Sequence, residues 1–69
     1  MYNTKDFFKD FRFWYESAKK CERWDEYSYD EGRLRGMNEM AYHMGLISFN
    51  TWDAIETLLQ KLTSAFIER

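Results

Sequence analysis

Apolar side chains recur along this chain at every third or fourth position, which is the spacing of helices that bury one face. In the first third of the chain, Asn3 or Thr4 can cap a helix, and Asp6 in the first turn suits the helix dipole. The apolar stripe that follows consists of Phe7, Phe11, Trp14, Ala18 and Cys21, widened on one side by Phe8 and Tyr15. The pattern predicts a helix near residues 4–20.

A second helix is predicted near residues 28–44. Ser28 and Glu31 have the spacing of a capping box, in which the serine hydroxyl accepts from the third amide and the glutamate reaches back to the cap. Apolar residues then follow at helical spacing: Leu34, Met37, Ala41 and Met44, flanked by Met40. Gly45 comes directly after the last of them, where a left-handed glycine commonly ends a helix.

The third helix is predicted over residues 48–67, with Ser48 as its N-cap. Ile47 precedes the cap and Trp52 lies four residues inside it, which is the spacing of a hydrophobic staple. The core positions form a heptad pattern that consists of Trp52, Ile55, Leu59, Leu62 and Phe66, broadened by Leu58. The connection from Gly45 to Ser48 is short, so the second and third helices should be antiparallel or sharply angled neighbours.

These segments predict an all-α fold, namely a compact three-helix arrangement in a single domain over residues 1–69. The chain has no proline, and no stretch alternates apolar and polar residues with the period of a strand. A chain this short buries only about 60% of its unfolded surface and is often marginally stable alone. Homodimerisation, with a helical dimer built from the same parts, is therefore the alternative way to complete the core.

The first 29 residues contain ten of the chain's fourteen aromatic residues. Each aromatic side chain buries about 150–250 Å², which together is more apolar area than a fold of this size readily hides. Phe13 and Trp24 fall outside the apolar stripe, and large apolar patches rarely stay uncovered on soluble monomers. With the acidic and aromatic residues after Trp24, they define the predicted partner-binding surface: Phe13, Trp24, Asp25, Glu26 and Tyr29.

Charge is unevenly distributed on a chain whose net charge is −2. Residues 21–31 are strongly acidic, whereas the chain as a whole lacks the basic footprint of a nucleic-acid-binding protein. The acidic residues lack the order of an EF-hand loop and predict a solvated joint between helices: Glu22, Asp25, Glu26, Asp30 and Glu31. The functional alternative is a patch that attracts a basic partner.

Two glycines, Gly32 and Gly36, lie inside the second predicted helix, where each costs about 1 kcal/mol relative to alanine. We expect them to make room for bulky rings of the first helix or for another backbone, with a binding groove as the alternative. We expect Met37, Met40 and Met44 to fill the core, with adaptable partner recognition as the alternative.

The sequence contains no catalytic constellation, no metal cluster and no cofactor motif. Cys21 is the only cysteine and His43 the only histidine, so a set of zinc ligands is absent. We expect Cys21 to be buried as a small hydrophobe and His43 to lie at the surface. The chain is therefore predicted not to be an enzyme and to use no cofactor.

The joint between the second and third helices resembles a DNA-binding helix-turn-helix motif in the spacing of Ala41, Gly45 and Ser48. The later apolar positions are one step out of register, however, and the would-be recognition helix carries Asp53 and Glu56 near its start. Carboxylates repel phosphates, so nucleic acid is not the expected partner.

The stretch from Gly32 to Ser48, GRLRGMNEMAYHMGLIS, followed by Trp52, resembles small helical accessory or inhibitory proteins of bacteriophages and mobile elements. Such proteins share a loose hairpin of two helices joined by a Gly-Leu-Ile-Ser turn. The resemblance implies a short accessory or inhibitory protein and not an enzyme, and it assigns no catalytic residue.

The sequence therefore favours a non-enzymatic protein–protein interaction module that binds a larger protein, or itself as a homodimer. A phage or mobile-element inhibitor of a host defence protein, such as an anti-CRISPR protein, is one concrete form. The alternative is a small helix-turn-helix-like DNA-binding transcription regulator. We find no signal peptide and no apolar run of about 18 residues, so a cytoplasmic location without membrane contact is expected.

Overall fold

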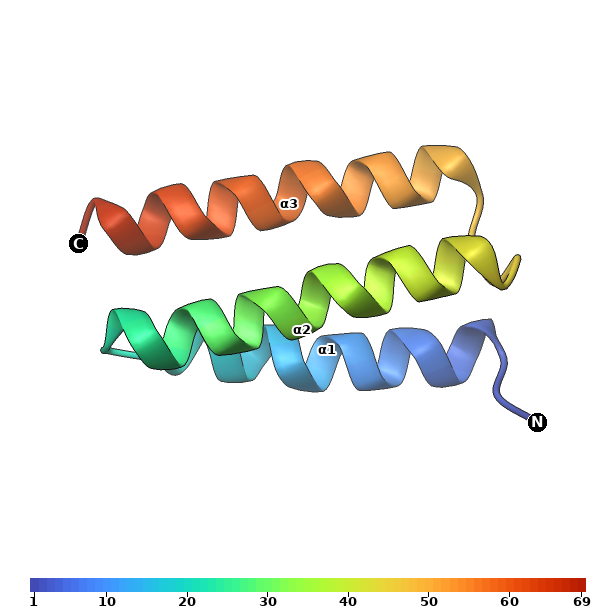
Figure 1. Cartoon of the computed structure of the whole chain (residues 1–69), viewed down its shortest axis with the longest axis horizontal. Coiled ribbons are helices and arrows are strands. Elements are labelled where there is room, and N and C mark those ends of the chain that lie inside the picture. Colours follow the sequence, from blue (N-terminus) through green and yellow to red (C-terminus); the bar gives the residue numbers. More distant parts are fainter.

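The computed structural model describes all residues from 1 to 69 as three α-helices joined by two short turns (Figure 1). Helix α1 spans Thr4–Lys20, α2 spans Trp24–His43 and α3 spans Phe49–Ile67. Each helix is antiparallel to the one before it, so α1 and α3 run in the same direction. The structure contains no strand, which confirms the predicted all-α, three-helix fold. None of the helices is both long enough and apolar enough to span a bilayer.

Helix α2 packs against both other helices, whereas the backbones of α1 and α3 come close to each other at few points. The chain thus forms an elongated body whose Cα atoms extend 36 × 22 × 14 Å. Its two termini lie at opposite ends of the long axis (Figure 1). Because α2 supplies nearly all of the interhelical packing, one side of α1 and one side of α3 have no helix against them.

The core is made of apolar residues from all three helices and from the turn before α3. Nine of them are buried: Phe7, Phe11, Ala18, Tyr27, Leu34, Ala41, Ile47, Ile55 and Leu59. The α1 stripe and the α3 heptad supply five of these as predicted, and Trp14, Trp52 and Leu62 pack half-buried against them. The interior is therefore narrow, and many apolar residues reach only its edge.

The ends of α1 and α3 have the predicted caps. The Asn3 side chain accepts from the Asp6 amide at 2.9 Å, and the Asp6 carboxylate accepts from the Asn3 amide at 3.1 Å. The Ser48 hydroxyl caps α3 by accepting from the Thr51 amide at 3.2 Å. Gly45 ends α2 with a φ of 76°, the left-handed conformation that glycine adopts without steric cost.

Helix α2 begins at Trp24, one turn earlier than predicted, so the capping box at Ser28 is wrong. The Ser28 hydroxyl instead donates within the helix to the Asp25 carbonyl at 3.4 Å. The longer helix buries Tyr27, whose ring stacks on Phe66 with centroids 4.5 Å apart. A cap contributes about 1 kcal/mol, whereas burying an aromatic ring contributes several times more at about 25 cal/mol per Å². Ring burial therefore sets the start of α2.

The buried face of α2 contains two polar residues, Asp30 and Asn38. The Ser17 hydroxyl and the Cys21 thiol donate to Asp30 Oδ2 at 2.8 and 3.5 Å. The prediction of a solvated acidic joint is therefore wrong for Asp30, because hydrogen bonds to α1 satisfy its carboxylate away from water. The prediction is also wrong for Glu31, which is half-buried and forms an ion pair on α2 with Arg35.

The two helical glycines make no close contact, so the close packing expected at Gly32 and Gly36 is wrong. A Cβ added at either position would meet no atom within 4 Å. The methionine prediction is also wrong for Met40 and Met44, which are 61% and 57% exposed, whereas Met37 is half-buried against the core. The cause is the rotation of α2 about its axis, which turns Met40 and Met44 toward solvent. The face that it buries instead includes two polar residues, Asp30 and Asn38.

Candidate functional site

The largest hollow on the surface is a groove between α1 and α3 of about 830 Å³, here called the α1–α3 groove. Its lining comes from one face of α1 and from a single residue of α3: Lys5, Asp6, Phe8, Lys9, Phe11, Arg12, Tyr15, Glu16 and Leu58. No α2 residue contributes. The groove exists because both flanking helices pack against α2 and leave their facing sides apart.

The floor of the α1–α3 groove is aromatic. Phe11 is buried and its ring stacks on Tyr15 with centroids 6.2 Å apart. Phe8 on α1 and Leu58 on α3 form the apolar sides and are 43% and 39% exposed. The apolar floor is therefore fixed by the core, while the sides stay accessible to a partner.

The rim of the groove carries three cations on α1, at Lys5, Lys9 and Arg12. None of them has a carboxylate oxygen within ion-pair distance. The two acidic residues in the groove are already engaged, since Asp6 caps α1 and Glu16 lies 3.9 Å from the Lys19 ammonium. The lining therefore carries three cations and two carboxylates, a net charge of +1, although the whole chain is slightly acidic.

The structure brings together three of the five residues predicted for partner binding. Asp25, Glu26 and Tyr29 line a small hollow at the α1–α2 joint, about 420 Å³ in volume. Phe13 and Trp24 do not line it. Both are exposed, at 65% and 53%, as expected of residues outside the core. A binding role for this set stays a prediction.

Phe13 and Trp24 belong to separate aromatic clusters. The Phe13 ring lies edge-on to Trp14, with centroids 5.2 Å apart, on the outer side of α1. Trp24 packs on Tyr27 and Phe66, between α2 and the end of α3. A single compact epitope therefore does not contain both rings.

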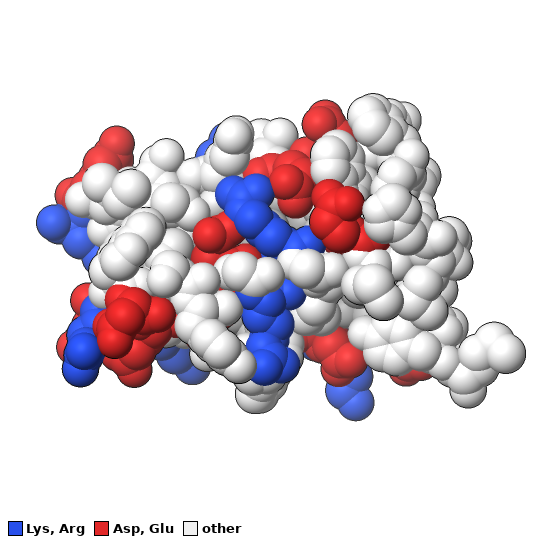
Figure 2. All heavy atoms as spheres, viewed as in Figure 1, with Lys and Arg blue, Asp and Glu red and all other residues white.

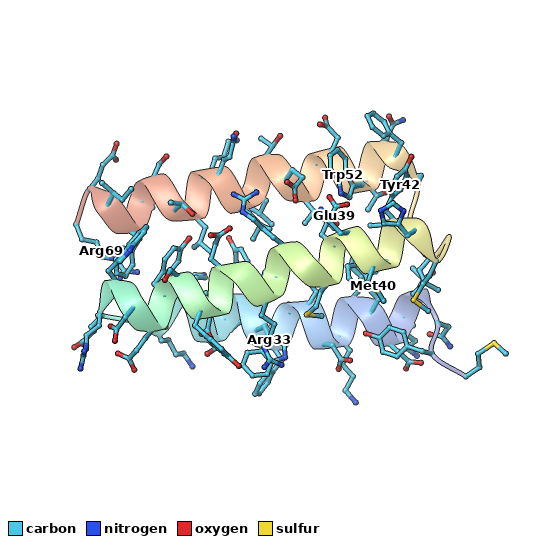
Figure 3. All side chains as sticks on the ribbon, viewed as in Figure 1. Arg33, Glu39, Met40, Tyr42, Trp52 and Arg69 are labelled. Atoms are coloured by element: carbon cyan, nitrogen blue, oxygen red, sulfur yellow. The ribbon has the colours of Figure 1, made fainter.

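Arg33 covers part of the half-buried Trp14 ring. Its guanidinium lies over the Trp14 ring, 4.2 Å from the centroid, and donates to the Tyr29 hydroxyl at 3.0 Å. Figure 3 shows this arginine projecting from α2 on the side of α1. Tyr29 is thus held by an intramolecular contact.

A second exposed aromatic group lies where α2 turns into α3, and we call it the turn cluster: Tyr42, Phe49 and Trp52. Glu39 accepts from Trp52 Nε1 at 2.9 Å, and Figure 3 shows Glu39, Tyr42 and Trp52 together between α2 and α3. Figure 2 shows this end of the molecule as largely free of charged atoms. The turn cluster is therefore mostly apolar, with the Glu39 carboxylate at its edge, unlike the α1–α3 groove with its row of cations.

Cys21 and His43 do not form a reactive pair. Burial, followed by a hydrogen bond to the Asp30 carboxylate, raises the pKa of the Cys21 thiol and keeps it protonated at neutral pH. A protonated thiol is a poor nucleophile. His43 is exposed, and its Nε2 atom lies 3.5 Å from Glu39 Oε2. No group of three or more His, Cys, Asp or Glu side chains is placed to hold a metal ion.

The groove is the feature that the sequence did not identify. Its apolar residues are predicted from the sequence as parts of core faces, with Phe8 and Tyr15 widening the α1 stripe and Leu58 the α3 heptad. The sequence does indicate that the apolar faces of α1 and α3 are wider than α2 alone can cover.

No protein-family model matches the chain, and the comparisons with curated proteins and with solved structures found no match. The resemblance to phage proteins stays a prediction.

Proposed function

We propose that this chain is a non-enzymatic protein–protein interaction module that binds a larger protein through the α1–α3 groove. The observation that supports it most is the combination of accessible apolar sides, Phe8 and Leu58, with three unpaired cations along one rim. Apolar area supplies binding free energy, and unpaired charge supplies orientation and a faster encounter.

The shape of the groove favours a macromolecular ligand. Small-molecule sites bury most of the ligand surface, whereas this groove is walled by one helix face and by Leu58 alone. Its lining runs from Lys5 to Glu16, which corresponds to about 16 Å along a helix axis at 1.5 Å per residue. A long, one-sided groove of this kind suits a segment of another protein.

The test compares two variants in an affinity capture of partners. Phe8→Glu combined with Leu58→Glu places two charges in the groove at residues that are already partly exposed, so the circular dichroism spectrum should stay helical. Phe49→Glu is the matched control, because it adds charge at an exposed ring in the turn cluster. We expect the groove variant to lose the captured partner and the control to retain it. Retention by both variants would contradict the proposal.

One concrete form of the proposal is an inhibitor encoded by a phage or mobile element that acts in the host cytoplasm, such as an anti-CRISPR protein. Its support is the resemblance of the Gly32–Ser48 stretch and the small size of the chain. In a host with an active defence system, expression of the chain should raise the titre of a targeted phage. Expression of the groove variant should not.

The DNA-binding alternative has less support. Helix-turn-helix motifs cross at about 90–120°, whereas α2 and α3 lie side by side and antiparallel (Figure 1). Helix α3 carries Lys61 as its only basic residue, against Asp53 and Glu56. A salt-dependent shift of duplex DNA by the chain, lost on Lys61→Glu, would favour this alternative.

Self-association is a second candidate, and the turn cluster favours it. A mostly apolar surface can pack against its own copy, whereas two α1–α3 grooves would bring their rows of cations together. Analytical sedimentation of the wild type and of Phe49→Asp measures the oligomeric state of each. It thereby tests whether a dimer forms through the turn cluster. A dimer that persists in Phe49→Asp would exclude the turn cluster as its interface.

A further inference from the structure

We infer that the α1–α3 groove receives an acidic amphipathic helix of the partner protein. This inference rests on the proposed function and names the kind of segment that fits the site. The apolar face of that helix would lie on Phe8, Phe11, Tyr15 and Leu58, and its carboxylates would lie beside Lys5, Lys9 and Arg12.

The arrangement of the helices argues for a helical ligand. Helices α1 and α3 run parallel, each packs against α2, and their facing sides have no helix between them. In four-helix bundles every helix contacts two neighbours around a shared core. A helix seated in the groove would supply the missing neighbour of both α1 and α3, which is the helix-in-groove mode of recognition.

The apolar residues of the groove have the spacing that an amphipathic helix recognises. Phe8, Phe11 and Tyr15 follow one another at intervals of three and four along α1. Leu58 stands opposite them on α3. A docking helix with apolar residues at matching intervals of three and four covers such a row over about two turns.

The cations determine the sign of the partner. Lys5, Lys9 and Arg12 are also spaced by four and three residues, so they form a second row along the same side of α1. A helix lying alongside presents carboxylates with the same spacing. The chain as a whole carries a net charge of −2, so attraction of an acidic helix requires a local group of cations such as this row.

A peptide fits better than a nucleic acid. Single strands are held by aromatic rings whose faces are free to stack on bases. The floor rings Phe11 and Tyr15 instead stack on each other, and Phe11 is buried. The remaining accessible apolar groups, Phe8 and Leu58, suit aliphatic side chains.

The experiment uses a synthetic peptide of about 18 residues, five helical turns, with leucine on one face, glutamate on both flanks and alanine elsewhere. Its matched control replaces every glutamate by lysine. Binding to the full chain is measured by fluorescence anisotropy and located by amide shifts in NMR spectra. We expect the acidic peptide to bind and to shift Phe8, Arg12 and Leu58, and the lysine peptide not to bind.

Charge reversal tests the cationic row. Lys9→Glu with Arg12→Glu should weaken binding of the acidic peptide by at least about tenfold at low ionic strength and should allow the lysine peptide to bind. The control is Lys20→Glu with Lys61→Glu, which makes the same change in net charge at exposed residues outside the groove. We expect the control to bind the acidic peptide as the wild type does.

Several outcomes would overturn the inference. Equal binding of the acidic and lysine peptides would show that Lys5, Lys9 and Arg12 do not select the charge of the ligand. Binding of a thymidine oligonucleotide or of phosphatidylglycerol vesicles at the groove, without binding of the acidic peptide, would assign the groove to another class of ligand. If the groove variant loses its captured partner but no acidic peptide binds, the interaction surface stands and the acidic helix is wrong. If neither test responds, the proposed function is wrong as well.

Discussion

Single polar residues in the interior decide how α2 is oriented. The Asn38 side chain is fully buried, and its Nδ2 donates to the Trp52 carbonyl at 3.1 Å and to Glu56 Oε2 at 3.0 Å. Arg35 donates to the same glutamate at 3.0 Å. These bonds join α2 to α3 at one register. A rotation of α2 would break them and leave Asn38 Nδ2 without a partner, in addition to Asn38 Oδ1, which has none.

At the residue scale, Cys21 provides a pH-dependent test. Its raised pKa means that the folded chain holds the thiol proton to higher pH than the unfolded chain does. The associated stability is present below the unfolded pKa and is lost as the pH rises through the folded pKa. We expect alkylation by iodoacetamide to have a pH midpoint above that of the urea-unfolded chain.

The Asp30 carboxylate contributes to that shift, after burial itself. Asp30→Asn should therefore move the alkylation midpoint part of the way back toward that of the unfolded chain. Asp53→Asn, at an exposed position on α3, is the control and should leave it in place. An unchanged midpoint in Asp30→Asn would show that burial alone raises the pKa.

At the scale of elements, the beginnings of α2 and α3 differ in their physical cause. Ser48 caps α3, so Ser48→Ala should lower the free energy of unfolding by about 0.5–2 kcal/mol. Ser28 lies inside α2 and caps nothing, so Ser28→Ala should change it by less than about 0.5 kcal/mol. Urea denaturation of the two variants measures the difference. If Ser28→Ala lost more free energy of unfolding than Ser48→Ala, Ser28 would be the N-cap of α2, and the predicted later start of α2 would be right.

The same contrast shows how far sequence reasoning reaches. Caps at Asn3 and Ser48 and the glycine at 45 act within a few residues, so α1, α3 and the turn before α3 were predicted closely. The start and buried face of α2 depend on distant partners, since Tyr27 needs Phe66. The α1–α3 groove was not predicted, because it arises from the distance between two helices and not from the pattern of either one.

At the scale of the whole molecule, neighbouring leucines separate stability from binding. Leu59 is fully buried, and Leu59→Ala should cost about 2–5 kcal/mol, enough to unfold much of so small a domain. Leu58 is 39% exposed in the groove, and Leu58→Ala should cost far less. Thermal unfolding followed by circular dichroism compares them. Equal losses of stability in the two variants would show that Leu58 is a core residue, so that the α3 side of the groove would not be accessible to a partner.

The central position of α2 also has a kinetic consequence. Both of the main helix pairs, α1 with α2 and α2 with α3, are consecutive along the chain, and the pair most distant in sequence barely meets. Few long loops must therefore close before native contacts form, which gives a low contact order. Helical proteins of this kind fold in microseconds to milliseconds. Temperature-jump relaxation should show a single phase in that range, and a slower dominant phase would mean that packing between α1 and α3 limits the rate.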